Sequence, residues 1–222
     1  VFWDGPIPTA DVIDAGHRNG VPVYGTLFFN WSSSASDREI LKKFLTKQIV
    51  DGKTIFPVAD KLIDMVEFYG FDGYFINQET DMFEPWGETM REFMLYAQRK
   101  AKERKGRIRF SWYDAMSNSG DRFHYDGVTT GNDFFVKPYG ADQQYAADEF
   151  FANFNWSSAK NDNTVRHMKE IGRNPFDAYA GFELQQRSYN TGISYRSLLD
   201  GEGKLKLSIG LYTPDSIRGM AV

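Results

Sequence analysis

An amide and a carboxylate two residues apart, Asn77 and Glu79, are the side chains in this sequence best placed to carry out a reaction. They end an apolar run that begins at Phe71 and is typical of a β-strand. Because strand side chains alternate between two faces, Asn77 and Glu79 should point to one side, and Ile76 and Gln78 to the other. A carboxylic acid can donate a proton there while the amide holds a neighbouring group.

The surrounding elements alternate between strand and helix, which is the order of a (β/α)8 TIM barrel in the α/β class. Residues at the carboxyl ends of barrel strands face the active site, so we expect Asn77 and Glu79 at its mouth. The same alternation places Ser111 and Tyr113 on the inner face of the next strand, with Tyr113 near Glu79. Predicted helices cover 10–19, 39–48, 57–69, 85–105 and 164–171, and predicted strands cover 1–4, 21–29, 71–80, 108–113, 149–156, 178–184 and 205–212.

The predicted elements form one domain. No repeat, low-complexity tract or linker divides residues 1–222. Seven strands are predicted where a closed barrel needs eight, so we expect an incomplete barrel whose last strand lies beyond Val222. The sequence therefore predicts a catalytic barrel domain that is a fragment of a larger polypeptide.

Composition narrows the classes of partner. The net charge is −4 and no long basic run occurs, which argues against nucleic acid or an anionic membrane surface as a partner. No apolar run reaches membrane-spanning length, so membrane insertion is not expected. With no cysteine and three scattered histidines, we expect neither a metal site nor a cofactor.

Aromatic residues are unusually frequent, at 16% of the chain, and their flat faces suit sugar rings. Most should be core, and only those near strand ends are candidates for a ligand, among them Trp31. His124, in the loop after the strand that carries Tyr113, either meets a sugar or is merely solvated.

A single acid is unusual for glycoside hydrolysis, which ordinarily uses two carboxyl groups. In substrate-assisted enzymes, however, the 2-acetamido oxygen of the sugar attacks the anomeric carbon, and a protein group holds the acetamido nitrogen. Asn77 could be that group. The stretch 72–79 has the length of the Asp-Gly-x-Asp-x-Asp-x-Glu motif of family 18 chitinases, but Phe75 and Asn77 replace two of its aspartates.

The chain resembles glycoside hydrolase family 85, whose members are endo-β-N-acetylglucosaminidases acting on N-glycans. The strongest part of the resemblance is the Asn77-Gln78-Glu79 strand together with Ser111-Trp112-Tyr113-Asp114. The matching stretches are 15–26, 68–79, 111–116 and 151–156.

The resemblance implies hydrolysis of the bond between the two core N-acetylglucosamines through an oxazoline, with retention of configuration. It makes Glu79 the general acid and base, Asn77 the amide that orients the acetamido group, and Tyr113 a contact to the oxazolinium. It also implies an N-glycan or glycoprotein substrate and a secreted or cell-surface, cell-wall location in a bacterium.

Substrate-binding residues transfer less directly from the family. The resemblance suggests that Trp156 walls a sugar subsite, with a core position as the alternative. Tyr212 and Glu183 lie at comparable strand ends. Two other functions stay open, a family 18-like chitinase and a glycan-binding module on a degenerate, inactive barrel. The binding module would keep aromatic platforms and lose the acid, so Glu79, Asn77 and Tyr113 together favour the enzyme.

Overall fold

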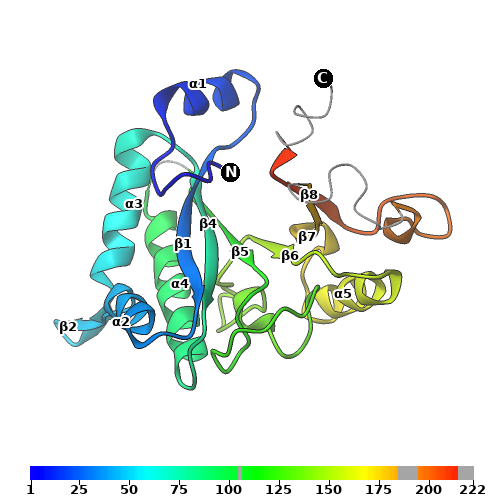
Figure 1. The fold of residues 1–222 in the computed structure, drawn as a ribbon. Helices are drawn as coiled ribbons and strands as arrows, with labels where there is room; N and C mark the ends of the chain where they lie inside the picture. Colours follow the sequence, from blue (N-terminus) through cyan, green and yellow to red (C-terminus); the bar gives the residue numbers. More distant parts are fainter. Residues whose placement is uncertain (105–106, 185–194, 215–222) are drawn as a thin grey trace.

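The computed structural model describes residues 1–104, 107–184 and 195–214, and these form a curved parallel sheet with helices outside it (Figure 1). The sheet has six strands in the order β1-β4-β5-β6-β7-β8, and a separate hairpin is formed by β2 and β3. All neighbouring strands of the large sheet are parallel, which confirms the α/β barrel class. The strands are β1 (Tyr24–Ser32), β2 (Gln48–Val50), β3 (Lys53–Ile55), β4 (Gly73–Thr80), β5 (Arg109–Tyr113), β6 (Glu149–Ala152), β7 (Ala178–Glu183) and β8 (Ser208–Tyr212).

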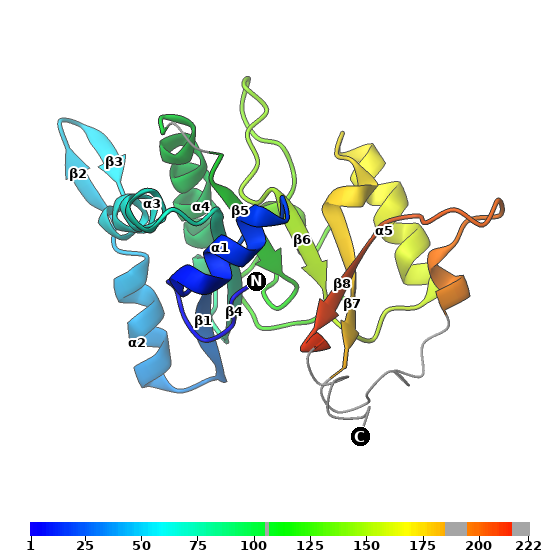
Figure 2. The same ribbon diagram turned by 90° about the horizontal axis from the view of Figure 1, so that it is seen from above.

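Helices cover the outside of the sheet in two groups. Helices α2, α3 and α4 flank β1 and β4, and α5 covers the side of β6 and β7 (Figure 2). None of the helices in the described ranges is long and apolar enough to cross a membrane. The helices are α1 (Ala10–Arg18), α2 (Ala35–Phe44), α3 (Pro57–Tyr69), α4 (Trp86–Lys102) and α5 (Ser158–Glu170), with short 3-10 turns η1 (Asp133–Phe135), η2 (Pro175–Asp177) and η3 (Tyr195–Leu198).

Strand β4 is buried on both faces, and glycines fix its start. Helix α3 ends at Gly70, whose φ of 75° is the left-handed conformation that glycine adopts without strain. Gly73 opens β4 so close to β5 that an added Cβ would lie 1.9 Å from the carbonyl oxygen of Arg109. These contacts fix the register of β4 against β5, and with it the position of Glu79.

The sheet ends at β1 and β8, which are not paired with each other in the described part of the chain. The expected strand at residues 1–4 is wrong. That segment runs beside β1 but pairs with it only in places, where Phe2 N donates to Tyr24 O (2.7 Å) and Thr26 N donates to Gly5 O (2.9 Å). Pro6, which follows at once, has no N–H to continue a ladder.

Smaller differences concern the helices and one hairpin. Helix α2 ends at Phe44, where we expected it to reach Gln48, and the β2–β3 hairpin follows. Its turn is Asp51-Gly52, with positive φ at both residues, as a tight hairpin requires. Lys105, the expected end of α4, lies outside the described residues.

The long connection from β5 to β6, residues 114–148, is attached to the barrel by a buried arginine. The Arg173 guanidinium donates to the carbonyl oxygens of Val136 (2.8 Å), Ala147 (3.2 Å) and Asp148 (2.8 Å). This attachment holds the later part of the connection, from Val136 to Asp148, against the barrel.

Candidate active site

The alternation expected for β4 is present. Asn77 and Glu79 line a pocket on the inner face of the sheet. Ile76 and Gln78 are buried on the opposite side. Gln78 is a polar residue in this apolar environment, and both ends of its amide are hydrogen-bonded. Its side chain donates to Thr80 O and accepts from Thr80 N, both at 2.8 Å.

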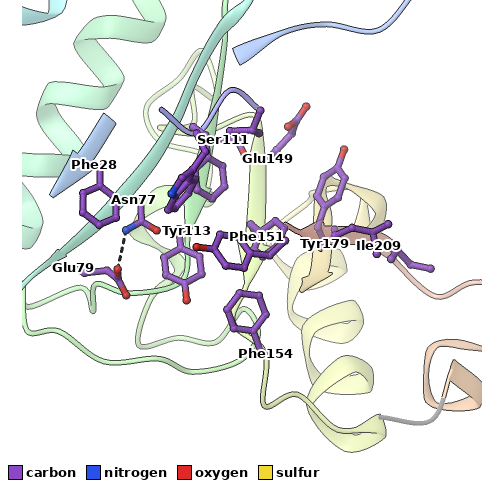
Figure 3. Close-up of a pocket in the computed structure, with 16 residues that line it drawn as sticks. Phe28, Asn77, Glu79, Ser111, Tyr113, Glu149, Phe151, Phe154, Tyr179 and Ile209 are labelled. Carbon is purple, nitrogen blue, oxygen red and sulfur yellow. Dashed lines mark hydrogen bonds between the residues drawn. The ribbon is translucent and has the colours of Figure 1, made fainter. Parts of the chain in front are cut away.

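The pocket has a volume of about 540 Å³ and occupies the interior of the open barrel (Figure 3). Half of its lining residues are aromatic, and Asn77, Glu79 and Tyr113 form its polar part near the carboxyl ends of the strands. The lining residues are Val1, Trp3, Phe28, Phe75, Asn77, Glu79, Ser111, Tyr113, Glu149, Phe151, Phe154, Tyr179, Ile209, Gly210, Leu211 and Tyr212.

Asn77 and Glu79 are joined by a hydrogen bond. Asn77 Nδ2 donates to Glu79 Oε2 at 2.8 Å (Figure 3). This bond turns the amide nitrogen toward Glu79, so the carbonyl oxygen Asn77 Oδ1 is left to accept from a ligand. The pair therefore offers a proton-transfer group and a hydrogen-bond acceptor side by side.

Tyr113 reaches the same pocket from β5. Its hydroxyl donates to Asn153 Oδ1 at 2.7 Å, and its ring packs against Phe75 and Phe151. Burial raises the pKa of the Tyr113 phenol, and the nearby Glu79 carboxylate raises it further. Tyr113 is therefore a neutral phenol at neutral pH.

His124 and Trp31 lie together beside Glu79. His124 Nε2 is 3.5 Å from Glu79 Oε1, and the imidazole stacks on the Trp31 indole with centroids 5.2 Å apart. Trp31 is 59% exposed, and the Arg122 guanidinium lies 4.1 Å from its ring centre. His124 is half-buried between the candidate acid and the exposed Trp31 ring, and contact between His124 and a sugar stays a prediction.

The three remaining candidates differ in position. Tyr212 lines the pocket, and its ring meets Trp3 and Phe154. Glu183 pairs in register with Tyr212 but does not line the pocket. Trp156 is 4% exposed, and its indole N–H donates to Gly181 O at 2.7 Å.

The expectation that Trp156 walls a sugar subsite is therefore corrected. Its ring packs on Phe182 and, with Val165 of α5, belongs to the hydrophobic core outside β7. The alternative, a core position, is the one that the structure has. The sequence could not separate the two, because a tryptophan four residues beyond the end of β6 can lie on either side of the sheet.

Several lining residues were not predicted. Trp3 packs edge-on against Phe28 and Tyr212, so it joins the two ends of the sheet across the pocket. Phe154 lies between Tyr113 and Tyr212. The alternation of β1 contained the signal for Phe28, whereas nothing local to the sequence marks Trp3 or Phe154.

A second carboxyl group, Glu149, lines the far end of the pocket (Figure 3). Glu149 is in register with Ser111, and Ser111 with Phe75, four residues before Glu79. At about 3.3 Å per residue the two carboxyl groups are roughly 13 Å apart along the strands. Two-carboxylate glycosidases use separations of about 5 to 9.5 Å, so Glu149 cannot be the partner of Glu79 in such a mechanism.

The comparisons with known proteins agree on one family. The model of glycosyl hydrolase family 85 matches residues 1–220. The crystal structure of the glycoside hydrolase domain of Endo-D from Streptococcus pneumoniae R6 is similar, with a TM-score of 0.91 and 53% identity over 99% of this chain and 34% of that one.

Curated relatives are more distant. The cytosolic endo-beta-N-acetylglucosaminidase of Danio rerio is 27% identical over 211 residues, which are 94% of this chain and 27% of the relative. The Homo sapiens protein of the same name is 26% identical over 214 residues, 94% of this chain and 26% of the relative. The chain thus spans about a quarter of the length of these relatives and about a third of the Endo-D chain.

The expected secreted or cell-surface location is wrong. The relatives from Danio rerio, Mus musculus, Homo sapiens and Gallus gallus are all named cytosolic. The expectation, including the cell-wall assignment, came from the resemblance alone and had no residue of this sequence behind it.

The matched fold, the match over nearly the whole chain and the Asn77–Glu79 pair at the barrel mouth lead to one assignment. The chain belongs to glycosyl hydrolase family 85.

Proposed function

We propose that the protein is an endo-β-N-acetylglucosaminidase that cleaves between the two core N-acetylglucosamines of N-glycans. The family assignment and the names of the relatives support the reaction. The mechanism is retaining and substrate-assisted, and the domain supplies its groups from its own side chains without a cofactor.

In the first step Glu79 gives its proton to the glycosidic oxygen. The bond from that oxygen to the anomeric carbon breaks, and the carbonyl oxygen of the 2-acetamido group attacks the same carbon to close an oxazolinium ring. Asn77 Oδ1 accepts the acetamido N–H, which aims the carbonyl oxygen at the anomeric carbon. The leaving N-acetylglucosamine departs with the Glu79 proton as its hydroxyl hydrogen.

In the second step Glu79, now a carboxylate, removes a proton from water. The resulting hydroxide adds to the anomeric carbon, and the oxazolinium ring opens to the acetamido group. Two inversions at one carbon give retention. Tyr113 contacts the oxazolinium, whose positive charge the phenol oxygen stabilises.

The aromatic walls hold the sugars. Tyr212 lines the pocket and offers a face for a sugar ring, while the exposed Trp31 and its neighbour His124 lie on the outer side of Glu79. We assign Trp31 and His124 to the sugars nearest the mouth. Contact between Glu183 and the substrate stays a prediction, since Glu183 lies beside Tyr212 outside the pocket lining.

One observation carries the proposal: Asn77 Nδ2 donates to Glu79 Oε2 at 2.8 Å in a pocket whose other carboxyl group is too distant to act with Glu79. A two-carboxylate enzyme needs a nucleophile or base that this arrangement lacks. A substrate with a 2-acetamido group brings its own nucleophile.

The test is to incubate the full-length protein with defined N-glycopeptides and to identify products by mass. We expect a glycan ending in one N-acetylglucosamine and a peptide that retains the other. Chitin oligosaccharides, cut in the same assay, would favour the chitinase alternative. Glycopeptides that bind but stay intact would favour a glycan-binding module.

A further inference from the structure

A chain of buried polar contacts runs from Tyr113 in the pocket to Lys160 at the surface. Tyr113 Oη donates to Asn153 Oδ1 at 2.7 Å, and Asn153 Nδ2 donates to Asp126 Oδ1 at 2.9 Å. Lys160 Nζ donates to Asp126 Oδ2 at 2.6 Å. These residues come from β5, from the end of β6, from the long β5–β6 connection and from α5.

The direction of every hydrogen bond in this chain follows from Asp126. A carboxylate only accepts, and Asp126 accepts from Asn153 Nδ2, from Asn155 N at 3.1 Å and from Lys160 Nζ. The amide nitrogen of Asn153 must therefore face Asp126, and its oxygen must face Tyr113. Since that oxygen cannot donate, the Tyr113 hydroxyl hydrogen is committed to Asn153.

Burial makes this arrangement rigid. Asn153 is 7% exposed and Asp126 is 5% exposed, so neither can exchange its partner for bulk water. A buried polar network whose members are all satisfied has a single low-energy arrangement, because reversing one bond would leave a donor or an acceptor unpaired. Asp126 has a φ of 57°, a conformation that costs energy for a residue other than glycine and that the network holds in place.

We propose that Asp126 and Asn153 are positioning residues that fix Tyr113 as a hydrogen-bond acceptor toward the substrate. This inference rests on the proposed function. With its hydrogen turned to Asn153, the phenol presents an oxygen lone pair to the pocket, where positive charge develops at the anomeric carbon and in the oxazolinium ring. A free hydroxyl could instead turn its hydrogen, the positive end of its dipole, toward that charge.

A double-mutant cycle on the full-length protein tests the inference. Tyr113→Phe removes the oxygen, and Asn153→Leu keeps the shape of the side chain but frees the hydroxyl. We expect each to lower kcat on a defined N-glycopeptide by on the order of tenfold to a hundredfold with KM little changed, because the lost interaction forms in the transition state. The double variant should lose no more than Tyr113→Phe alone, because Asn153 acts only through Tyr113.

A matched control is available in α5. Asn161 is 2% exposed, and its Nδ2 has no hydrogen-bond partner among the described residues. Asn161→Leu makes the same substitution at a buried position that takes no part in the network, and it should keep wild-type kcat. Losses in the double variant that multiply would overturn the positioning role, and so would an Asn153→Leu protein with wild-type kcat.

Two further variants complete the test. If Asn153→Leu does not fold, Asp126→Asn takes its place in the same cycle, because an amide at 126 lets Asn153 turn its nitrogen toward Tyr113. The expected and contradicting outcomes are unchanged. Glu79→Gln tests the proposed function separately. A fully active Glu79→Gln protein would show that Glu79 is not the acid. Multiplicative losses at Tyr113 and Asn153 would contradict only the positioning role.

Discussion

The pocket contains two carboxyl groups, and they are held in opposite ways. Glu149, at the amino end of β6, accepts from Tyr24 Oη and from Arg109 Nη1, both at 3.1 Å. Glu79, at the carboxyl end of β4, accepts from the neutral amide of Asn77 and has His124 Nε2 at 3.5 Å. Glu149 is thus paired with the permanent cation of Arg109, whereas Glu79 contacts a neutral amide and lies near a histidine.

A carboxyl group in a pocket is therefore not by itself a candidate acid. Burial raises the pKa of Glu149, and Tyr24 and Arg109 oppose that rise. Glu149 Oε1 accepts both of these hydrogen bonds, so both of its lone pairs are in use. Glu149 also lies at the amino ends of the strands, whereas barrel active sites form at the carboxyl ends. Glu79 lies at the carboxyl end of its strand, and these surroundings are the reason that we propose it, and not Glu149, as the acid.

The largest effect should come from Glu79→Gln. The amide keeps the shape of the side chain but cannot give or take the proton, so kcat should fall by roughly two to four decades. Binding of an intact N-glycan should persist, since the aromatic walls are unchanged. Turnover and binding of the full-length variant can be measured on the same glycopeptide. Near-normal turnover would mean that Glu79 is not the acid.

Asn77→Ala should have the next largest effect, and it should depend on the substrate. If Asn77 orients the acetamido group, its loss should slow the cleavage of an N-glycopeptide by on the order of tenfold to a thousandfold. A sugar oxazoline, in which the ring is already closed, should be affected much less. Rates on both donors measure this difference, and equal losses would mean that Asn77 serves only to hold Glu79.

Glu149→Gln is the matched variant at the other end of the pocket. Replacing the charge weakens the bond to Arg109, and we expect about 2 kcal/mol less stability with kcat within a few-fold of wild type. Urea unfolding and turnover of the same preparation separate the two quantities. A folded Glu149→Gln protein that had lost turnover would make Glu149 part of the chemistry.

The sequence was sufficient to predict the strand that carries Glu79. A run of alternating faces between Gly73 and Thr80 needs no tertiary information, since the chain itself places Asn77 and Glu79 on one side. Strands that alternate with helices form a parallel sheet with helices outside it, so the α/β class followed as well. The Asp51-Gly52 pair is also typical of a tight turn. The strands on either side, β2 and β3, have three residues each, which is too short for a strand pattern to be recognised in the sequence.

The rest of the site depends on contacts between distant segments. Asn153 and Asp126 are 27 residues apart and meet only because the long β5–β6 connection folds back over the strand ends. Trp3 walls the pocket because the first residues lie across from β8, which no local pattern encodes. Trp156 shows the opposite limit, since an indole suits a sugar and a core equally and only packing decides between them.

The smallest predicted effect concerns Asp114, a buried carboxyl group outside the pocket lining whose hydrogen-bond donors among the described residues are neutral. Burial raises the pKa of Asp114 to about 6, while the N–H groups of Tyr125, Gly127 and Asn132 partly oppose it. Because its pKa is higher in the folded than in the unfolded chain, the folded protein binds the proton more tightly, so stability falls as pH rises from about 4 to 6 and then levels off.

Between pH 5 and pH 7 this group should contribute a loss of about 1 kcal/mol in unfolding free energy. Other groups titrate over the same interval, so the measurement is the difference between wild type and Asp114→Asn in urea unfolding at both pH values. That difference should shrink as the pH rises, because the wild type alone has a proton to lose. If it stays constant, neutral donors are enough to hold a buried carboxylate charged. Neutral donors alone would then not explain the proposed acid role of Glu79. That role would have to depend on the position of Glu79 at the barrel mouth, beside His124.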